Sequence, residues 1–276
     1  MIASHHRTQT NGQLLASRAE RAFIALISRA VFVSVFIAAI STSLVADESW
    51  QETWRKAISN DRVEELASLW ESTENRQRLQ EMLELRTDNG KNAFMIAAKT
   101  GNHGLFESLL AAGADPDART ATGGTPIMFA VLGNHSDIVN RLLEEGVDVN
   151  AQGSNGWSAL TIAAAKGYSG LITLLSTRGA DINATDVYRW SPLMRAVDNG
   201  HDEVVDRMLS LDNLNLLQQD EAGNTALHYA VVHNNVRIAK ALLAAGADPE
   251  IENLQQQTPR DLVLSRSASK ELMELF

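Results

Sequence analysis

A period of 33 residues runs through most of this 276-residue chain and restricts the folds open to it. Each unit opens on an Asn, Thr or Ser followed by a short apolar segment. The residues at this opening position are Asn92, Thr125, Ser158, Ser191, Thr225 and a degenerate sixth, Thr258, at steps of 33 residues with a single step of 34. A unit this short cannot bury its own apolar face, so the period predicts a stack of similar units whose mutual interfaces form the core.

The opening residues of each unit predict the start of a helix. A Thr or Ser side chain can cap a helix, and proline is tolerated at the first helical position, where its missing N–H is not needed. The capping residues are Thr125, Ser158, Ser191 and Thr225, and prolines follow the opening position at Pro126, Pro192 and Pro259. We therefore expect every unit to begin with a capped helix.

Each unit continues through a turn into a second, leucine-rich helix. A Gly or Asn permits the left-handed backbone that ends a helix. These residues are Gly101, Asn134, Gly167, Gly200 and Asn234. Small residues at one repeated position allow the helices to approach closely. They are Ala97, Ala130, Ala163, Ala196 and Ala230. The pattern predicts an all-α chain of paired helices, and most units close on a Gly-Ala-Asp element that turns the chain into the next one.

The complete pattern resembles the ankyrin-repeat family, whose signature is Thr-Pro-Leu-His-x-Ala with a 33-residue period. The segment Thr225-Ala-Leu-His-Tyr-Ala230 matches this signature closely. The resemblance implies an ankyrin-repeat solenoid of helix-turn-helix units joined by β-hairpin turns. It also implies a non-enzymatic module, without a cofactor, that binds another protein on its concave face and hairpin tips.

The chain divides into four predicted segments. Residues 1–46 form a signal peptide or N-terminal anchor, and residues 47–86 form a helical cap or half repeat. Five repeats occupy residues 87–250, and a capping repeat occupies residues 251–276. Trp50 and Trp54 lie four residues apart on one helix face, where we expect them to cover the exposed end of the first full repeat.

The first 46 residues have the order of a secretory signal: a basic region, an apolar run over residues 30–40, and small residues up to Ala46. Cleavage after Ala46, or alternatively after Ser43, would release a periplasmic or secreted protein. The alternatives are a membrane anchor through residues 22–46, which would place Arg29 within the membrane, and an organelle transit peptide. We expect the mature protein to be a monomer that meets a membrane only if this segment stays uncleaved.

Charge and composition exclude several classes of function. The chain carries a net charge of −10, and the predicted signal is basic, so the remainder is more acidic still. An acidic body repels the phosphates of nucleic acids and is attracted to basic partners. The chain has no cysteine, which excludes disulfides, thiolate metal sites and a lipoprotein anchor.

The sequence offers no catalytic or metal-binding constellation that we would defend. The segment Gly167-Tyr-Ser169-Gly170 is one residue short of a nucleophile elbow and lies between two helices. His228 and His233 are five residues apart, which points them to different helix faces. A hydrolase using Ser169 remains an alternative, as does an envelope-anchored scaffold.

The fourth unit departs from the pattern and supplies the candidate binding site. Arg189 occupies the position that is glycine in neighbouring units, and a retained turn there would cost about 1 kcal/mol of backbone strain. Trp157 and Trp190 share one repeat position, and aromatics with arginines are typical of binding hot spots. We predict a partner-binding site formed by Trp157, Tyr188, Arg189, Trp190 and Arg195. The alternative is that both tryptophans fold back to cover the seam between units. The partner would be another protein, with roles such as inhibitor, immunity protein or stabiliser of an exported enzyme.

Overall fold

The computed structural model describes residues 49–265 and 268–276, and the predicted export segment, residues 1–46, lies outside them. The chain separates into two compact units, Met1–Thr53 and Trp54–Phe276, and the second contains all the repeats. Among the described residues, no helix has the length and apolar character needed to cross a membrane.

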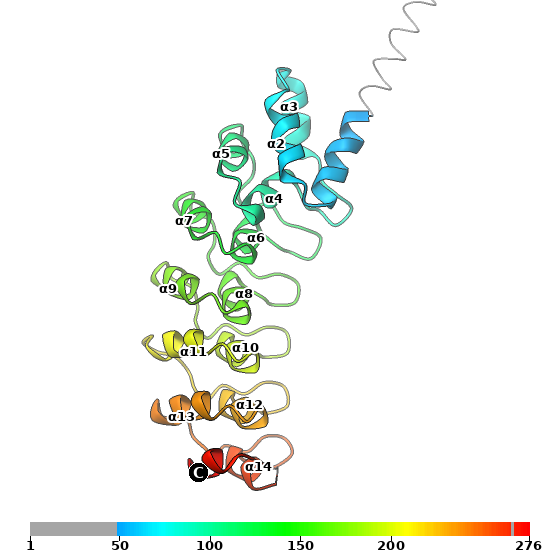
Figure 1. Cartoon of the computed structure of the whole chain (residues 1–276). Helices are drawn as coiled ribbons and strands as arrows, with labels where there is room; N and C mark the ends of the chain where they lie inside the picture. Colours follow the sequence, from blue (N-terminus) through cyan, green and yellow to red (C-terminus); the bar gives the residue numbers. More distant parts are fainter. Residues whose placement is uncertain (1–48, 266–267) are drawn as a thin grey trace, which may run out of the picture. The chain divides into compact units, whose positions relative to one another are not determined.

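Successive helix pairs stack in one direction within residues 54–276, as Figure 1 shows. The first helix of each pair belongs to an inner row, whose members contact one another in chain order. The inner row comprises α4 (Ala93–Thr100), α6 (Pro126–Leu132), α8 (Ala159–Lys166), α10 (Pro192–Asp198), α12 (Ala226–Val232) and α14 (Pro259–Ser265). The outer row comprises α5 (His103–Ala111), α7 (Ser136–Glu144), α9 (Ser169–Thr177), α11 (Asp202–Leu209), α13 (Val236–Ala244) and α15 (Lys270–Met273). The all-α solenoid expected from the period is confirmed.

The core lies between and within the rows, as the small residues predicted. Ala97, Ala130, Ala163, Ala196 and Ala230 are all fully buried. Because these side chains are small, consecutive inner helices approach closely and exclude water along the whole stack.

The helix caps follow the predicted scheme with one correction. The Ser158 and Ser191 hydroxyls accept the backbone N–H groups of Thr161 and Met194, each at 3.2 Å. The prediction of a side-chain cap at Thr125 was wrong, because its buried Oγ1 has no hydrogen-bond partner within the described residues. The backbone at Thr125 nevertheless keeps the extended conformation that precedes a helix, and α6 begins on Pro126.

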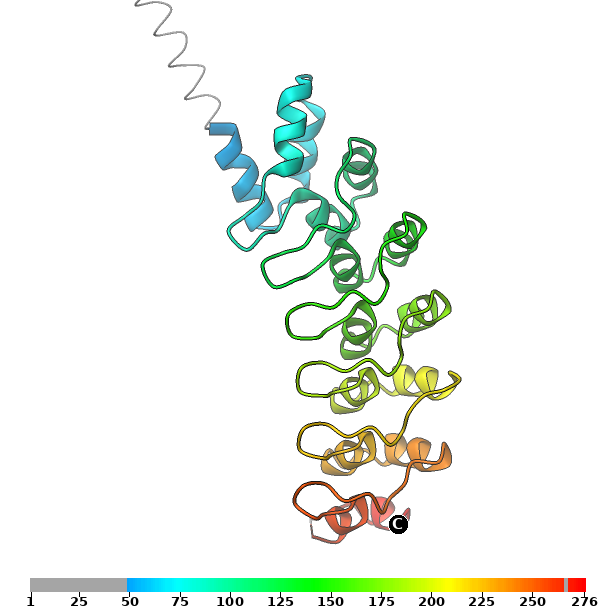
Figure 2. The ribbon, with the colours of Figure 1, turned by 180° about the vertical axis from the view of Figure 1, so that it is seen from behind.

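Hairpin loops link each outer helix to the next inner helix, and together they form a row on one side of the stack (Figure 2). Each loop bonds to the next through its backbone. The N–H of Ala121 donates to the Asn89 carbonyl at 2.8 Å, and that of Ser154 donates to the Thr122 carbonyl at 2.8 Å. Loops and inner helices therefore form a single continuous surface, which we call the hairpin face.

Within the second unit, the N-terminal end of the stack is closed by a helical segment over residues 54–59 and by α2 (Val63–Glu71) and α3 (Arg76–Glu84). Trp54 is fully buried in this cap; its indole N–H donates to the Met82 carbonyl at 3.1 Å, and its ring lies 6.4 Å from that of Trp70. Helix α2 packs on α4 and α5. Trp54 therefore fills the core of the cap, which in turn covers the first repeat.

Candidate protein-binding face

The turn at Arg189 is the same as its glycine-containing counterparts. Arg189 has a φ of +62°, in the left-handed region, and Gly156 one unit earlier has +78°. The Arg189 N–H donates to the Asp186 carbonyl at 2.9 Å, and the Asp186 N–H donates to the Trp190 carbonyl at 3.0 Å. The equivalent two bonds around Gly156 have the same lengths. The fourth unit therefore keeps the turn, and Arg189 takes the left-handed conformation that would strain it.

Asp186 is the centre of this turn, and sequence analysis missed it. Its side chain has no solvent exposure and accepts the backbone N–H groups of Tyr188 and Trp190, each at 2.9 Å. It also forms an ion pair with the guanidinium of Arg195 on α10. One buried carboxylate therefore fixes both the hairpin tip and a side chain of the inner helix.

Arg195 continues this arrangement into a stack that crosses three units. Its guanidinium carbon lies 5.1 Å from the centre of the Trp157 ring and 4.3 Å from that of Trp190, both within the range of cation–π attraction. On the far side, the rings of Trp190 and Tyr229 lie 4.3 Å apart. Tyr229 donates its hydroxyl to Asp220, and burial together with this carboxylate raises the pKa of Tyr229.

The five predicted site residues therefore occupy two settings. Trp157, Trp190 and Arg195 come together in the stack, where both tryptophans are half-buried and the Arg195 side chain is 18% exposed. Tyr188, at 59% exposed, and Arg189 stand on the hairpin tip in front of it. The stack also joins neighbouring units, as the alternative interpretation of the tryptophans required.

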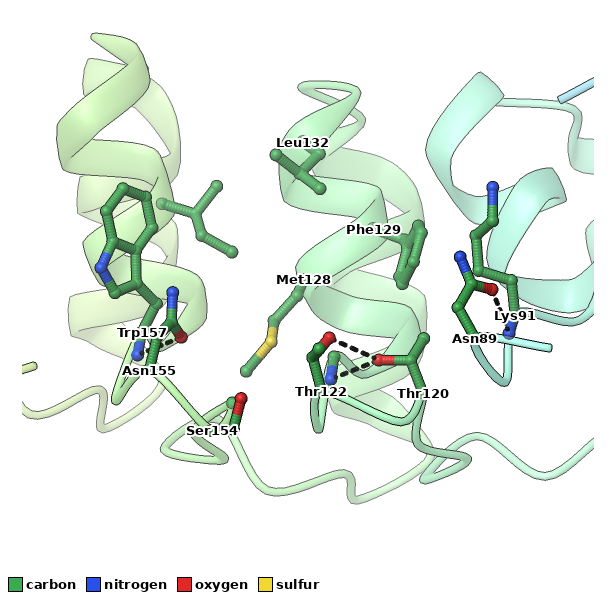
Figure 3. A pocket seen from close by; sticks show the side chains of 13 residues that line it. Asn89, Lys91, Thr120, Thr122, Met128, Phe129, Leu132, Ser154, Asn155 and Trp157 are labelled. Atoms are coloured by element: carbon green, nitrogen blue, oxygen red, sulfur yellow. Dashed lines mark hydrogen bonds between the residues drawn. The ribbon is translucent and has the colours of Figure 1, made fainter. Parts of the chain in front are cut away.

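A hollow of about 510 Å³ opens on the hairpin face beside Trp157 (Figure 3). Apolar side chains of α6 and α8 line it: Met128, Phe129, Leu132 and Ile162. Hydroxyl and amide side chains from three hairpins complete its rim, and Lys91 is the one charged residue among the 13 that line it. The sequence analysis did not identify this hollow.

The other candidates for chemistry have structural settings. The Ser169 hydroxyl lies on the surface and donates to the Glu203 carboxylate at 2.8 Å, which does not provide the imidazole base of a serine hydrolase. His228 is fully buried; its Nδ1 accepts the Thr225 N–H at 3.0 Å, and its Nε2 lies 3.1 Å from the Gln257 carbonyl. Burial lowers the pKa of His228, against opposing effects of the Gln257 carbonyl and of Asp220.

No group of three or more potential metal ligands occurs within residues 49–265 and 268–276. The hairpin face presents a cation held between aromatic rings, an exposed tip and an apolar hollow. These are features through which one protein surface binds another.

The family model for ankyrin repeats matches the chain in three overlapping copies, over residues 57–152, 94–186 and 179–253. The chain belongs to the ankyrin-repeat family, whose repeats act as protein-binding modules. It is also similar to an ankyrin repeat protein of Acanthamoeba polyphaga mimivirus, with 37% identity over 70 residues. That match covers 25% of this chain and 10% of the viral protein.

Proposed function

We propose that this chain is an exported protein that binds a partner protein through its hairpin face, with the contact centred on the fourth unit. The single observation that supports this most strongly is the exposed tip formed by Tyr188 and Arg189, backed by the stack around Arg195. An exposed aromatic and arginine on a rigid support have the composition of an energetic hot spot.

The support matters because ordering a flexible loop on binding would reduce the affinity. Asp186 holds the backbone of the tip and the Arg195 guanidinium at the same time. The side chains of Trp157 and Trp190 are already ordered by the cation between them. Little conformational entropy therefore remains to be lost when a partner docks there.

Export is part of the proposal and rests on the order of basic, apolar and small residues before Asp47. An exported binding module without catalytic groups suits an inhibitor, an immunity protein or a stabiliser of an exported enzyme. An uncleaved segment over residues 22–46 would make it a membrane-tethered scaffold with the same binding face.

Affinity measurements on surface variants test the binding proposal. A partner captured with the tagged chain from the envelope fraction and identified by mass spectrometry is titrated by calorimetry. We expect Tyr188→Ala to weaken its binding by about 2 kcal/mol or more with little change in stability. Trp157→Ala and Trp190→Ala should weaken binding per folded molecule by as much, with some loss of stability because both rings contact Arg195 in the stack between units. Leu254→Ala is the control, because Leu254 is 77% exposed on the tip of the sixth unit. Unchanged affinity in all three variants would place the binding face elsewhere.

The hydrolase alternative has its own test. Esterase and peptidase assays on the purified chain and on Ser169→Ala separate the two functions. Turnover that disappears in Ser169→Ala would contradict the assignment as a binding module.

A further inference from the structure

The hollow beside Trp157 exists because one side chain is missing from the repeated pattern. The position just before the N-cap of each inner helix carries Lys91, Gly124, Trp157 and Trp190 in the first four units. Gly124 adds no side chain between its neighbours, so Lys91 and Trp157 become opposite walls. Figure 3 shows Met128 and Phe129 between these two walls.

The floor of the hollow presents an apolar surface to solvent. Leu132 at its edge is 38% exposed and Phe129 is half-buried, while Met128 and Ile162 are buried beneath them. A volume of about 510 Å³ falls within the range of pockets that take up a ligand.

The rim is suited to the backbone of an extended peptide. Asn89 and Asn155 occupy the first and third hairpin tips, and their Oδ1 atoms accept the backbone N–H groups of Lys91 at 3.3 Å and Trp157 at 3.1 Å. These bonds direct the two NH₂ groups away from the turns (Figure 3). Amide donors on both sides of an apolar floor can bind main-chain carbonyls while a side chain enters between them.

The wall at Lys91 gives the hollow a local charge opposite to that of the chain. Lys91 is the one charged residue that lines the hollow, and it shares the carboxylate of Asp61 with Lys99, which lies outside the lining. The whole chain, by contrast, has a net charge of −10. Complementarity at this end of the hollow therefore favours an acidic residue in the bound segment.

We propose that the hollow takes one large apolar side chain from an extended segment of the partner protein, with an acidic residue of that segment beside Lys91. This inference rests on the proposed function and specifies the chemistry of the partner. Gly124 provides the space, the two asparagines hold the backbone, and Lys91 selects the charge.

A peptide selection tests it on the purified full-length chain. A displayed library of random peptides of about twelve residues is selected for binding, and enriched sequences are synthesised and titrated by fluorescence anisotropy. We expect a shared large apolar residue with Asp or Glu near it. Replacing that acidic residue by Asn in the peptide should weaken binding to the wild type more than to Lys91→Gln.

The chain offers a matched pair of variants for the floor. Leu132 and Val232 occupy the same repeat position with 38% and 36% exposure, but only Leu132 lines the hollow. We expect Leu132→Glu to weaken the peptides about tenfold or more and Val232→Glu to leave them within about twofold. Leu132→Gln serves as the milder variant if thermal melting shows that Leu132→Glu is unfolded.

Three results would overturn the inference: no enriched sequence, enrichment of basic residues, or peptides that bind Leu132→Glu as well as the wild type. The proposed function is judged separately by the effect of Tyr188→Ala on the full partner. A partner that loses affinity in Tyr188→Ala but not in Leu132→Glu would keep the binding face and remove the hollow from it.

Discussion

The close approach of neighbouring hairpins makes Gly156 one of the most sensitive positions on the hairpin face. It has a φ of +78°, and a Cβ added there would lie 2.7 Å from the Asp186 Cα and 2.8 Å from the Val187 nitrogen. Both atoms belong to the backbone of the next loop and cannot move aside as a side chain can. Gly156→Ala should therefore push the third and fourth hairpins apart.

A second glycine isolates this effect from backbone strain. Gly146 has a φ of +84°, but a Cβ there would meet nothing within 4 Å. Alanine costs about 1 kcal/mol in the left-handed region at both positions, and it reduces the entropy of the unfolded chain equally in both. The remaining difference is the overlap at Gly156, and overpacking of this kind costs about 1–3 kcal/mol. We expect Gly156→Ala to lose that much more unfolding free energy than Gly146→Ala.

Urea denaturation of the two full-length variants, followed by far-ultraviolet circular dichroism, measures the difference. The Val187 N–H, which donates to the Asn155 carbonyl at 3.1 Å, should also exchange its proton faster in Gly156→Ala. Equal losses of stability in the two variants would show that the hairpins do not approach as closely as this structure has them.

Four further outcomes are expected. Ala163→Asp puts a carboxylate into a fully buried interface and should cost several kcal/mol; an unchanged melting temperature would refute the assigned register. Burial holds the pKa of His228 below its ordinary value of 6.5, so the stability that this residue contributes is complete above pH 6.5 and is lost as the pH falls below it. The melting temperature of His228→Gln should therefore fall less than that of the wild type over the same pH range. The pKa of Asp61 lies below its ordinary value of 3.8, because the effects of Lys91 and Lys99 outweigh burial, so the stability that its carboxylate contributes is lost only as the pH falls below 3.8. At neutral pH, Asp61→Asn should speed hydrogen exchange in the cap but not in α12. Cleavage of the signal predicts a soluble chain starting at or near Asp47, whereas N-terminal sequencing of an intact chain from the membrane pellet would indicate an anchor.

Features that depend on local backbone chemistry could be predicted from the sequence. The inter-helix turn has a φ of +60° at Asn134, and α10 begins on Pro192. The strained turn at Arg189 could be predicted from the glycines of the other units. The sixth unit holds Gln256 in the same strained position, with a φ of +56°. The repeat spacing indicates this too, because Gln256 lies 33 residues after Gly223.

Side-chain contacts on the hairpin face could not be predicted, because the repeat pattern aligns equivalent positions without showing which side chains reach each other. Asp186 and Asp220 occupy the same position, and so do Arg195 and Tyr229. In both units the aspartate binds the side chain on the inner helix. The hollow could not be predicted from the sequence either, because it depends on the absence of a side chain at Gly124 and not on the presence of a particular residue type.

The two halves of the hairpin face differ because the residues at two repeat positions, one in the hairpin loop and one on the inner helix, change along the chain. In the fourth and fifth units an aspartate ties the loop to a long polar side chain on the inner helix, and these side chains and Trp190 cover that surface. In the second unit the same two positions are Thr120 and Phe129, which make no such tie, and the surface stays open beside Gly124. A rigid, filled wall next to an open apolar hollow is what a partner with one protruding side chain and a flat flank requires. Gly124, Asp186 and Arg195 therefore depart from the pattern where the proposed contact lies, while the residues that build the stack keep it.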